Sequence, residues 1–211
     1  MFTWVYSTYL ISCTHMIPKG ILEKYYVREG KSMQEIAKLQ KCSLHKVAYW
    51  MIFYQIARRS KGDAAYLKNN PNGDPFKFRP PRGIQNAKMF GYGLGLYAGE
   101  GTKADKTSVR LGNTNPAIIL NFMHFLEEIF RVQRKDFRLG LQLFTDIKED
   151  IALDFWCKYL KVKRAQFYKT TFTRSGSIGT YRKKSEFGVV TLYYHNKRLR
   201  DMLCGFVENF R

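Results

Sequence analysis

Three glycines recur at every fourth position in the segment GYGLGLYAGEG. Apolar residues flank them, and the segment predicts a helix over residues 86–100. Glycine costs a helix up to about 1 kcal/mol per position relative to alanine, so this helix needs a compensating contact. Gly91, Gly95 and Gly99 share one face, and small residues at this spacing let two helix backbones approach closely. The pattern therefore predicts that this helix packs tightly against a second helix.

An acidic residue, Glu100, directly follows the last of these glycines. If two copies of the helix met about a two-fold axis, their two Glu100 carboxylates would lie side by side. Like charges at short range are unfavourable unless a cation lies between them. Mg²⁺ suits oxygen ligands and phosphate substrates, and paired metal ions can activate water for phosphodiester cleavage. We therefore expect Glu100 and the adjacent Gly99 to hold Mg²⁺ in a homodimer.

The charge of the chain indicates its class of partner. Lys and Arg number 36 against 17 Asp and Glu, which gives a formal net charge of +19. Such an excess destabilises a compact chain unless a polyanion offsets it, and nucleic acid offsets it by releasing counterions. A basic protein without a nucleic-acid partner is the alternative. Hydrophobic residues make up 45% of the chain, which excludes disorder throughout.

The first part of the chain predicts a helical domain over residues 17–61, after an N-terminal extension of residues 1–16. Ser32 and Glu35 have the spacing of a capping box, in which each side chain satisfies a backbone N–H of the other residue. After a short turn, Ser43 is a second good N-cap. The segment EIAKLQKCSLHKVAYW resembles the helix-turn-helix of many bacterial and archaeal regulators and recombinases.

This resemblance implies that the helix after Ser43 enters the major groove of DNA, where its first turns face the base edges. The residues expected to read bases are Leu44, His45, Lys46 and Tyr49. The residues expected to contact phosphates are Lys24, Arg28, Arg58, Arg59 and Lys61. The alternative is a helical packing module without DNA function.

Residues 62–85 are rich in Asn, Gly and Pro, which interrupt helices and strands, and we interpret them as a linker. Helical and strand patterns alternate over residues 86–211. In FRLGLQLF, over residues 137–144, apolar side chains alternate with Arg138 and Gln142, as in a strand with one buried face. The sequence therefore predicts an α+β domain with helices on one face of an antiparallel sheet.

Residues 93–101, GLGLYAGEG, resemble the nine-residue motif of the LAGLIDADG homing endonucleases, and LYAGEGTK resembles a bacterial and archaeal variant of it. The later order of elements and the segment FWCKYLKVKRAQFYK are also similar to that family. The resemblance implies a saddle-shaped sheet on DNA. Because only one motif is present, it also implies a homodimer. The last acid of the motif corresponds to Glu100, here Glu instead of the commoner Asp, while the first acid is replaced by Ala98.

A basic segment follows between Lys161 and Ser185, with eight basic residues and no acid. We expect residues from this segment and from the earlier strands to line a sheet in the major groove or to clamp phosphates. These DNA-binding candidates are Arg110, Asn113, Arg138, Gln142, Lys163, Arg164, Lys169, Thr171, Thr173, Arg174, Arg182, Lys183 and Lys184. Lys103 is expected to polarise the scissile phosphate. A solvated charged loop is the alternative for the segment.

Two main functions fit these patterns. One is a sequence-specific, Mg²⁺-dependent DNA endonuclease acting as a homodimer; the other is a DNA-binding transcriptional regulator that keeps the fold without cleavage. RNA binding ranks third. The sequence contains no transmembrane run, so we expect no membrane partner. The four cysteines show no metal or redox spacing, which predicts a reducing compartment, cytoplasmic or organellar.

Overall fold

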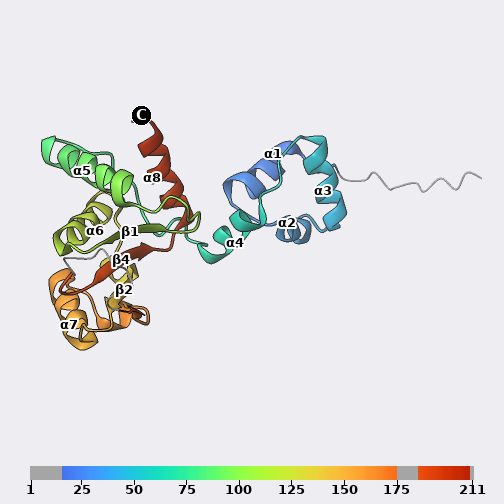
Figure 1. Ribbon diagram of the computed structural model, residues 1–211. Coiled ribbons are helices and arrows are strands. Elements are labelled where there is room, and N and C mark those ends of the chain that lie inside the picture. The colour runs from blue at the N-terminus through green and yellow to red at the C-terminus, as the bar shows by residue number, and fades with distance from the viewer. Residues whose placement is uncertain (1–15, 175–184, 210–211) are drawn as a thin grey trace, which may run out of the picture. The chain divides into compact units, whose positions relative to one another are not determined.

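The chain divides after Asp74 into two units, Met1–Asp74 (unit 1) and Pro75–Arg211 (unit 2), in a computed structural model (Figure 1). The structure describes residues 16–174 and 185–209. Within those residues it contains eight α-helices and one four-stranded sheet, and the sheet belongs to unit 2. No helix in this part of the chain is both long enough and apolar enough to span a bilayer.

Unit 1 is made of short helices around a small apolar core. The elements are α1 (Lys19–Leu22), the π-helical turn η1 (Glu23–Arg28), α2 (Met33–Leu39), α3 (Leu44–Phe53) and α4 (Lys61–Asn69). Leu22, Ile36, Val47 and Met51 are completely buried in its core. These apolar side chains come from three successive helical segments, so the core ties α1, α2 and α3 together.

The two N-caps predicted in unit 1 are confirmed. The backbone N–H of Glu35 donates to Ser32 Oγ at 3.2 Å, and the N–H of Ser32 donates to Glu35 Oε2 at 2.7 Å. Ser43 Oγ accepts from the N–H of Lys46 at 3.3 Å and so begins α3. Each cap satisfies a helical N–H that has no partner within the helix, which defines where α2 and α3 begin.

The segment predicted as a linker, residues 62–85, is more structured than its composition indicates. Its start lies in α4, whose first turn is capped by Ser60. Its last part belongs to unit 2, because Phe76 is buried in that unit's core and the N–H of Lys77 donates to the carbonyl of Phe130 at 2.7 Å. The boundary at Asp74 therefore lies inside the predicted range, with folded chain on both sides.

The sheet of unit 2 is mixed and not purely antiparallel, which corrects the sequence prediction. It consists of β1 (Val109–Asn113), β2 (Arg138–Phe144), β3 (Thr171–Thr173) and β4 (Val189–Tyr194), in the order β1-β4-β2-β3. β4 is antiparallel to β1 and β2, whereas β3 is parallel to β2. The chain between β2 and β3 passes through the helix α7 (Glu149–Leu160), and a crossover of this kind returns the chain in the same direction.

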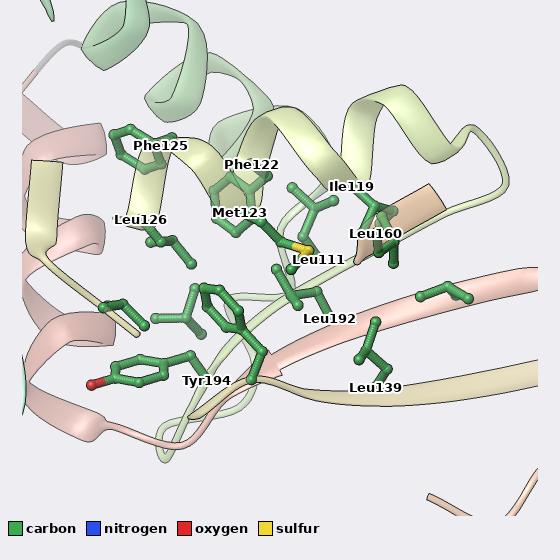
Figure 2. Close-up of a cluster of buried hydrophobic side chains, with 14 of the residues drawn as sticks. Leu111, Ile119, Phe122, Met123, Phe125, Leu126, Leu139, Leu160, Leu192 and Tyr194 are labelled. Carbon is green, nitrogen blue, oxygen red and sulfur yellow. The ribbon is translucent and has the colours of Figure 1, made fainter. Parts of the chain in front are cut away.

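Helices cover one face of this sheet, as predicted for the α+β class. They are α5 (Ile84–Glu100), α6 (Pro116–Phe130), α7 and α8 (Lys197–Asn209). Figure 2 shows Met123 of α6 directed toward Leu111 of β1, while Phe122 of the same helix stacks on Tyr97 of α5 at a centroid distance of 6.0 Å. The alternation predicted for residues 137–144 is confirmed, because Phe137, Leu139, Leu141 and Leu143 are buried. Within the described residues of unit 2, no helix packs on the other face, which carries most of the polar side chains of the strands.

Candidate nucleic-acid interface

The sheet face opposite the helices, here called the open face, carries arginine, glutamine, threonine and tyrosine side chains. It is formed by Arg110, Gly112, Arg138, Gly140, Gln142, Phe144, Thr171, Thr173, Val189, Thr191 and Tyr193, of which Phe144 and Val189 are apolar and partly buried. Residues opposite one another in a register share a face, and Tyr193 is paired with Arg110 on one side and Arg138 on the other. Gln142 Nε2 donates to Thr173 Oγ1 at 3.0 Å, which places β3 on the same surface.

None of the four strands contains an acidic residue. The carboxylate that contacts the open face is that of Asp105, which forms an ion pair with Arg110 at its edge. A polyanion such as DNA is bound by cationic groups and by neutral hydrogen-bonding groups, whereas carboxylates repel it. The electrostatic character of this face therefore suits phosphate and base contacts.

Arg110 is oriented by contacts to three neighbours. Its Nε donates to Ser108 Oγ at 2.9 Å, its guanidinium pairs with Asp105, and it lies 5.1 Å from the ring centroid of Tyr193. The hydroxyl and the N–H of Thr107 both donate to Asp105 Oδ1. These hydrogen bonds, with smaller contributions from Ser108 and Arg110, lower the pKa of Asp105 to about 2. A carboxylate that stays ionised holds the arginine in place at neutral pH.

A tyrosine–histidine cluster at one end of the open face was not predicted. Tyr168 Oη lies 2.6 Å from Nε2 of His195, and the rings of Tyr193 and His195 stack at a centroid distance of 5.9 Å. Burial lowers the pKa of His195, and the nearby positive charge of Arg110 lowers it further. The sequence signal was present in the alternation of GVVTLYYH, which places Thr191, Tyr193 and His195 at every second position.

Several predicted DNA-binding residues lie elsewhere. Asn113 has the register of the buried residues and pairs with Val190, and its Oδ1 accepts from the N–H of Asn115 at 2.8 Å. Arg164 is paired with Asp150 of α7 at 2.6 Å. Lys169 is exposed but precedes β3, so it lies outside the strand that carries Thr171 and Thr173.

The other predicted residues of the basic segment lie outside the helices and strands or outside the described residues. Lys163 is exposed and precedes the 3-10 turn η3 (Arg164–Gln166), and Arg174 is exposed directly after β3. Arg182, Lys183 and Lys184 lie outside the described residues.

The glycine face of α5 is open. A Cβ added at Gly91, Gly95 or Gly99 would have no heavy atom within 4 Å, apart from neighbouring backbone of its own helix. Ile84 and Tyr92 on the same helix are 74% and 49% exposed, unusually high values for such side chains. The surface is therefore smooth, largely uncharged and free to receive another helix, with Lys88 as its cation.

Glu100 ends α5 at the edge of the sheet. The next residue, Gly101, forms a β-bridge with Leu111, and the N–H of Thr102 donates to the carbonyl of Arg110 at 3.0 Å. These bonds hold the two residues after Glu100 against β1, the edge strand that carries Arg110. The Glu100 side chain is exposed, and within residues 16–174 and 185–209 its carboxylate has no hydrogen-bond or ion-pair partner.

Lys103 lies just after Glu100, but its ammonium group is engaged. Its Nζ donates to the carbonyl of Ala98 in the last turn of α5 and lies 5.9 Å from the ring centroid of Tyr97. Arg200 of α8 holds the same loop by donating to the carbonyls of Lys103 and Asp105. Lys103 therefore closes the end of α5, a role the sequence did not predict.

A single chain offers few ligands for a metal ion. Among the described residues, no group of three or more His, Cys, Asp or Glu side chains could hold one. Asp105, the nearest acid along the chain, is already paired with Arg110. The oxygen donors that remain are the Glu100 carboxylate and the carbonyl of Gly99, which has no partner in this part of the chain. The residues fit Mg²⁺ only if a second copy brings its own pair to the same place.

Unit 1 exposes most of the residues predicted to read bases. Leu44, His45 and Tyr49 are exposed on α3, and Lys46 is half-buried. The same helix exposes Ile52 and Phe53, which were not among the predicted base-reading residues. The outer surface of α3 is thus mainly apolar and aromatic, with no acidic residue on the helix.

The guanidinium of Arg59, which was predicted to contact phosphate, is engaged within unit 1, whereas Arg58 is exposed. The Arg59 guanidinium donates to the carbonyls of Tyr26, Gly30 and Lys31, and its Cζ lies 3.9 Å from the ring centroid of Tyr26. It therefore satisfies one carbonyl within η1 and two after it, a structural role that local sequence did not indicate.

Comparisons with protein-family models, with curated proteins and with solved structures found no match for this chain.

Proposed function

We propose that this protein is a sequence-specific, double-stranded-DNA endonuclease that acts as a homodimer with Mg²⁺. The observation that carries the proposal is the position of Glu100. An unpaired carboxylate lies at the end of an open glycine face, one residue before the bridge to β1, the strand that carries Arg110. A dimer contact, a DNA-binding surface and a candidate reactive group thus meet at one edge of unit 2.

The glycine face supports the homodimer. Two α5 helices related by a two-fold axis along their length would pack Gly91, Gly95 and Gly99 against the same residues of the other copy, with short backbone separation. Both Glu100 residues then lie at the same end of the pair. Because β1 is the strand next to this end, the two open faces form one long surface.

The composition of the open face supports recognition of duplex DNA. Arginine donates to O6 and N7 of guanine, glutamine pairs with N6 and N7 of adenine, and threonine contacts either a base edge or the thymine methyl group. Arg138, Gln142 and Thr171 are exposed on this face and offer all three kinds of contact. Gly112 and Gly140 flank Thr191 in the register, and the ring of Tyr193 lies over Gly140.

Glu100 supports the nuclease activity. Its carboxylate and the Gly99 carbonyl of each copy would hold Mg²⁺, which when bound supplies an activated water and stabilises the leaving oxygen. The chain itself positions these ligands: Lys103 closes α5 at Ala98, and Arg200 holds the following loop. Arg110, oriented by Asp105, would bind the phosphate next to the cleaved bond.

Unit 1 supports a second DNA contact. Ser32 and Ser43 cap α2 and α3, which are separated by a short turn, and His45 and Tyr49 are exposed near the start of α3. In a helix-turn-helix, these positions face the major groove. The exposed Arg58 would contact a phosphate.

The alternative, a regulator that binds DNA without cleaving it, is favoured by one observation. Each chain has a single free acid at the end of α5, where the motif resemblance implies a second acid at the position of Ala98. With fewer carboxylates the site would bind Mg²⁺ more weakly, while recognition by the open face would be unaffected.

The test begins with selection of target sites from a random duplex library by the wild-type protein. The selected duplex is then incubated with Mg²⁺ and wild type, Glu100→Gln or Glu149→Gln. Glu149 is an exposed acid in the first turn of α7 and serves as the matched control. We expect cleavage by wild type and E149Q, and loss of cleavage with unchanged binding in E100Q.

Two outcomes contradict the proposal in different ways. If all three proteins bind the selected duplex and none cleaves it, the regulator is the correct function. If competing single-stranded RNA displaces the duplex as well as the selected DNA does, double-stranded DNA is not the specific partner.

A further inference from the structure

A cavity of about 380 Å³ lies on the helical side of unit 2, away from the open face. Its walls come from the segment before α5, the first turn of α5 and the end of α6. Its charged and amide lining residues are Arg79, Arg82, Asn86, Glu128 and Arg131. Asn86 is 14 residues before Glu100 on α5, which corresponds to roughly 21 Å along a helix. The cavity is therefore distinct from the site proposed for cleavage.

The charges around this cavity are not balanced by protein groups. Three arginines face one glutamate, and Glu128 lies 3.8 Å from the guanidinium of Arg131. Within the described residues, the guanidinium groups of Arg79 and Arg82 have no carboxylate or carbonyl partner. Cations gathered in one concave site repel one another unless an anion enters it.

The backbone that carries these arginines is held firmly. The N–H groups of Lys77 and Arg79 donate to the carbonyls of Phe130 and Ile129, both at 2.7 Å. Phe78 between them packs on Phe130 and Phe206 at centroid distances of 5.4 and 5.2 Å. Arg79 therefore projects from a fixed segment, which lowers the entropy cost of binding a ligand.

We infer that this arginine cavity binds a phosphate group. The guanidinium of arginine is planar and matches two oxygens of a phosphate at once, and the Asn86 amide adds a neutral donor. The phosphate comes either from a free phosphate or nucleotide, or from the backbone of the DNA held by the protein. In the second case the inference rests on the proposed DNA binding; in the first it does not.

The experiment compares full-length wild type with Arg79→Gln/Arg82→Gln and with the control Lys148→Gln/Lys158→Gln. The control removes two exposed cations that do not line the cavity. One arm measures thermal unfolding in inorganic phosphate against chloride at equal ionic strength. The other measures the salt dependence of duplex binding.

A free-phosphate site predicts that phosphate raises the unfolding temperature of wild type and control but not of R79Q/R82Q. A backbone site predicts that the slope of log K against log salt falls by about 2 in R79Q/R82Q and not in the control, since each phosphate contact contributes about 0.9. If R79Q/R82Q matches the control in both arms, the cavity is not a phosphate site. That result leaves the proposed nuclease intact, because Glu100 and the open face are unchanged.

Discussion

Gly93 of α5 packs directly against the ring of Phe125 on α6, so that an added Cβ would lie 2.1 Å from Cγ of that ring. The glycines of α5 therefore serve two surfaces. Gly93 faces inward and lets α5 approach α6, whereas Gly91, Gly95 and Gly99 face outward into open space. This distinction gives opposite predictions for substitutions two positions apart.

We expect Gly93→Ala to destabilise unit 2 by about 1–3 kcal/mol, because the methyl group overpacks a rigid contact with Phe125. The gain in helix propensity offsets only part of this cost. Chemical denaturation followed by circular dichroism measures the change. Equal stability of G93A and wild type would show that the two helices do not pack this closely.

Gly95→Ala is expected to stabilise the isolated chain by up to about 1 kcal/mol, since the methyl group meets no atom within 4 Å. The same methyl group separates the two helix backbones in the proposed dimer and should weaken it. Sedimentation equilibrium and thermal unfolding at low protein concentration measure the two effects. An unchanged dimer affinity would exclude this face of α5 as the interface.

Arg59→Ala is expected to destabilise unit 1 by at least about 2 kcal/mol, because three backbone carbonyls lose a charged donor. The neighbouring Arg58→Ala should leave stability unchanged and reduce DNA affinity, since Arg58 is exposed. Amide hydrogen exchange in α1 to α3 reports the first effect. Similar exchange in the two variants would argue against the structural role of Arg59.

We expect the contribution of Asp105 to the stability of the folded state to depend on pH. The hydrogen bonds from Thr107 lower the pKa of Asp105 from 3.8 to about 2, so the folded state binds the proton more weakly than the unfolded state. The stabilisation is therefore fully present above pH 4 and is lost as the pH falls from about 4 to 2. Unfolding temperatures of wild type and Asp105→Asn should differ at pH 6 and converge near pH 2. A constant difference across this range would contradict the assignment.

The open face predicts which basic residues matter for DNA binding. Arg138→Gln removes an exposed charge from that face, while Arg164→Gln removes a charge already paired with Asp150. We expect R138Q to lower the slope of log K against log salt by about 1 and R164Q to change it little. Fluorescence anisotropy with a labelled duplex at several salt concentrations measures both slopes. If R138Q and R164Q give equal slopes, DNA does not bind on the open face.

The sequence by itself determined the elements whose signals are local. Ser32 and Ser43 begin α2 and α3 because a side-chain oxygen three residues before an N–H is sufficient to cap it. Asn115 begins α6 in a similar way, because its Oδ1 accepts from the N–H of Ala117, two residues later, at 2.9 Å. The buried face of β2 followed from alternation alone, since a strand has a period of two.

Only the tertiary structure decided the features that depend on residues far apart in the chain. Arg59 reaches carbonyls about 30 positions earlier, and no local pattern separates it from Arg58. The parallel pairing of β3 depends on where α7 returns the chain, and the roles of Gly93 and Gly95 depend on where α6 lies. Caps and alternation arise from neighbouring residues, whereas these contacts arise from how whole elements pack, and the packing exists only in the folded chain.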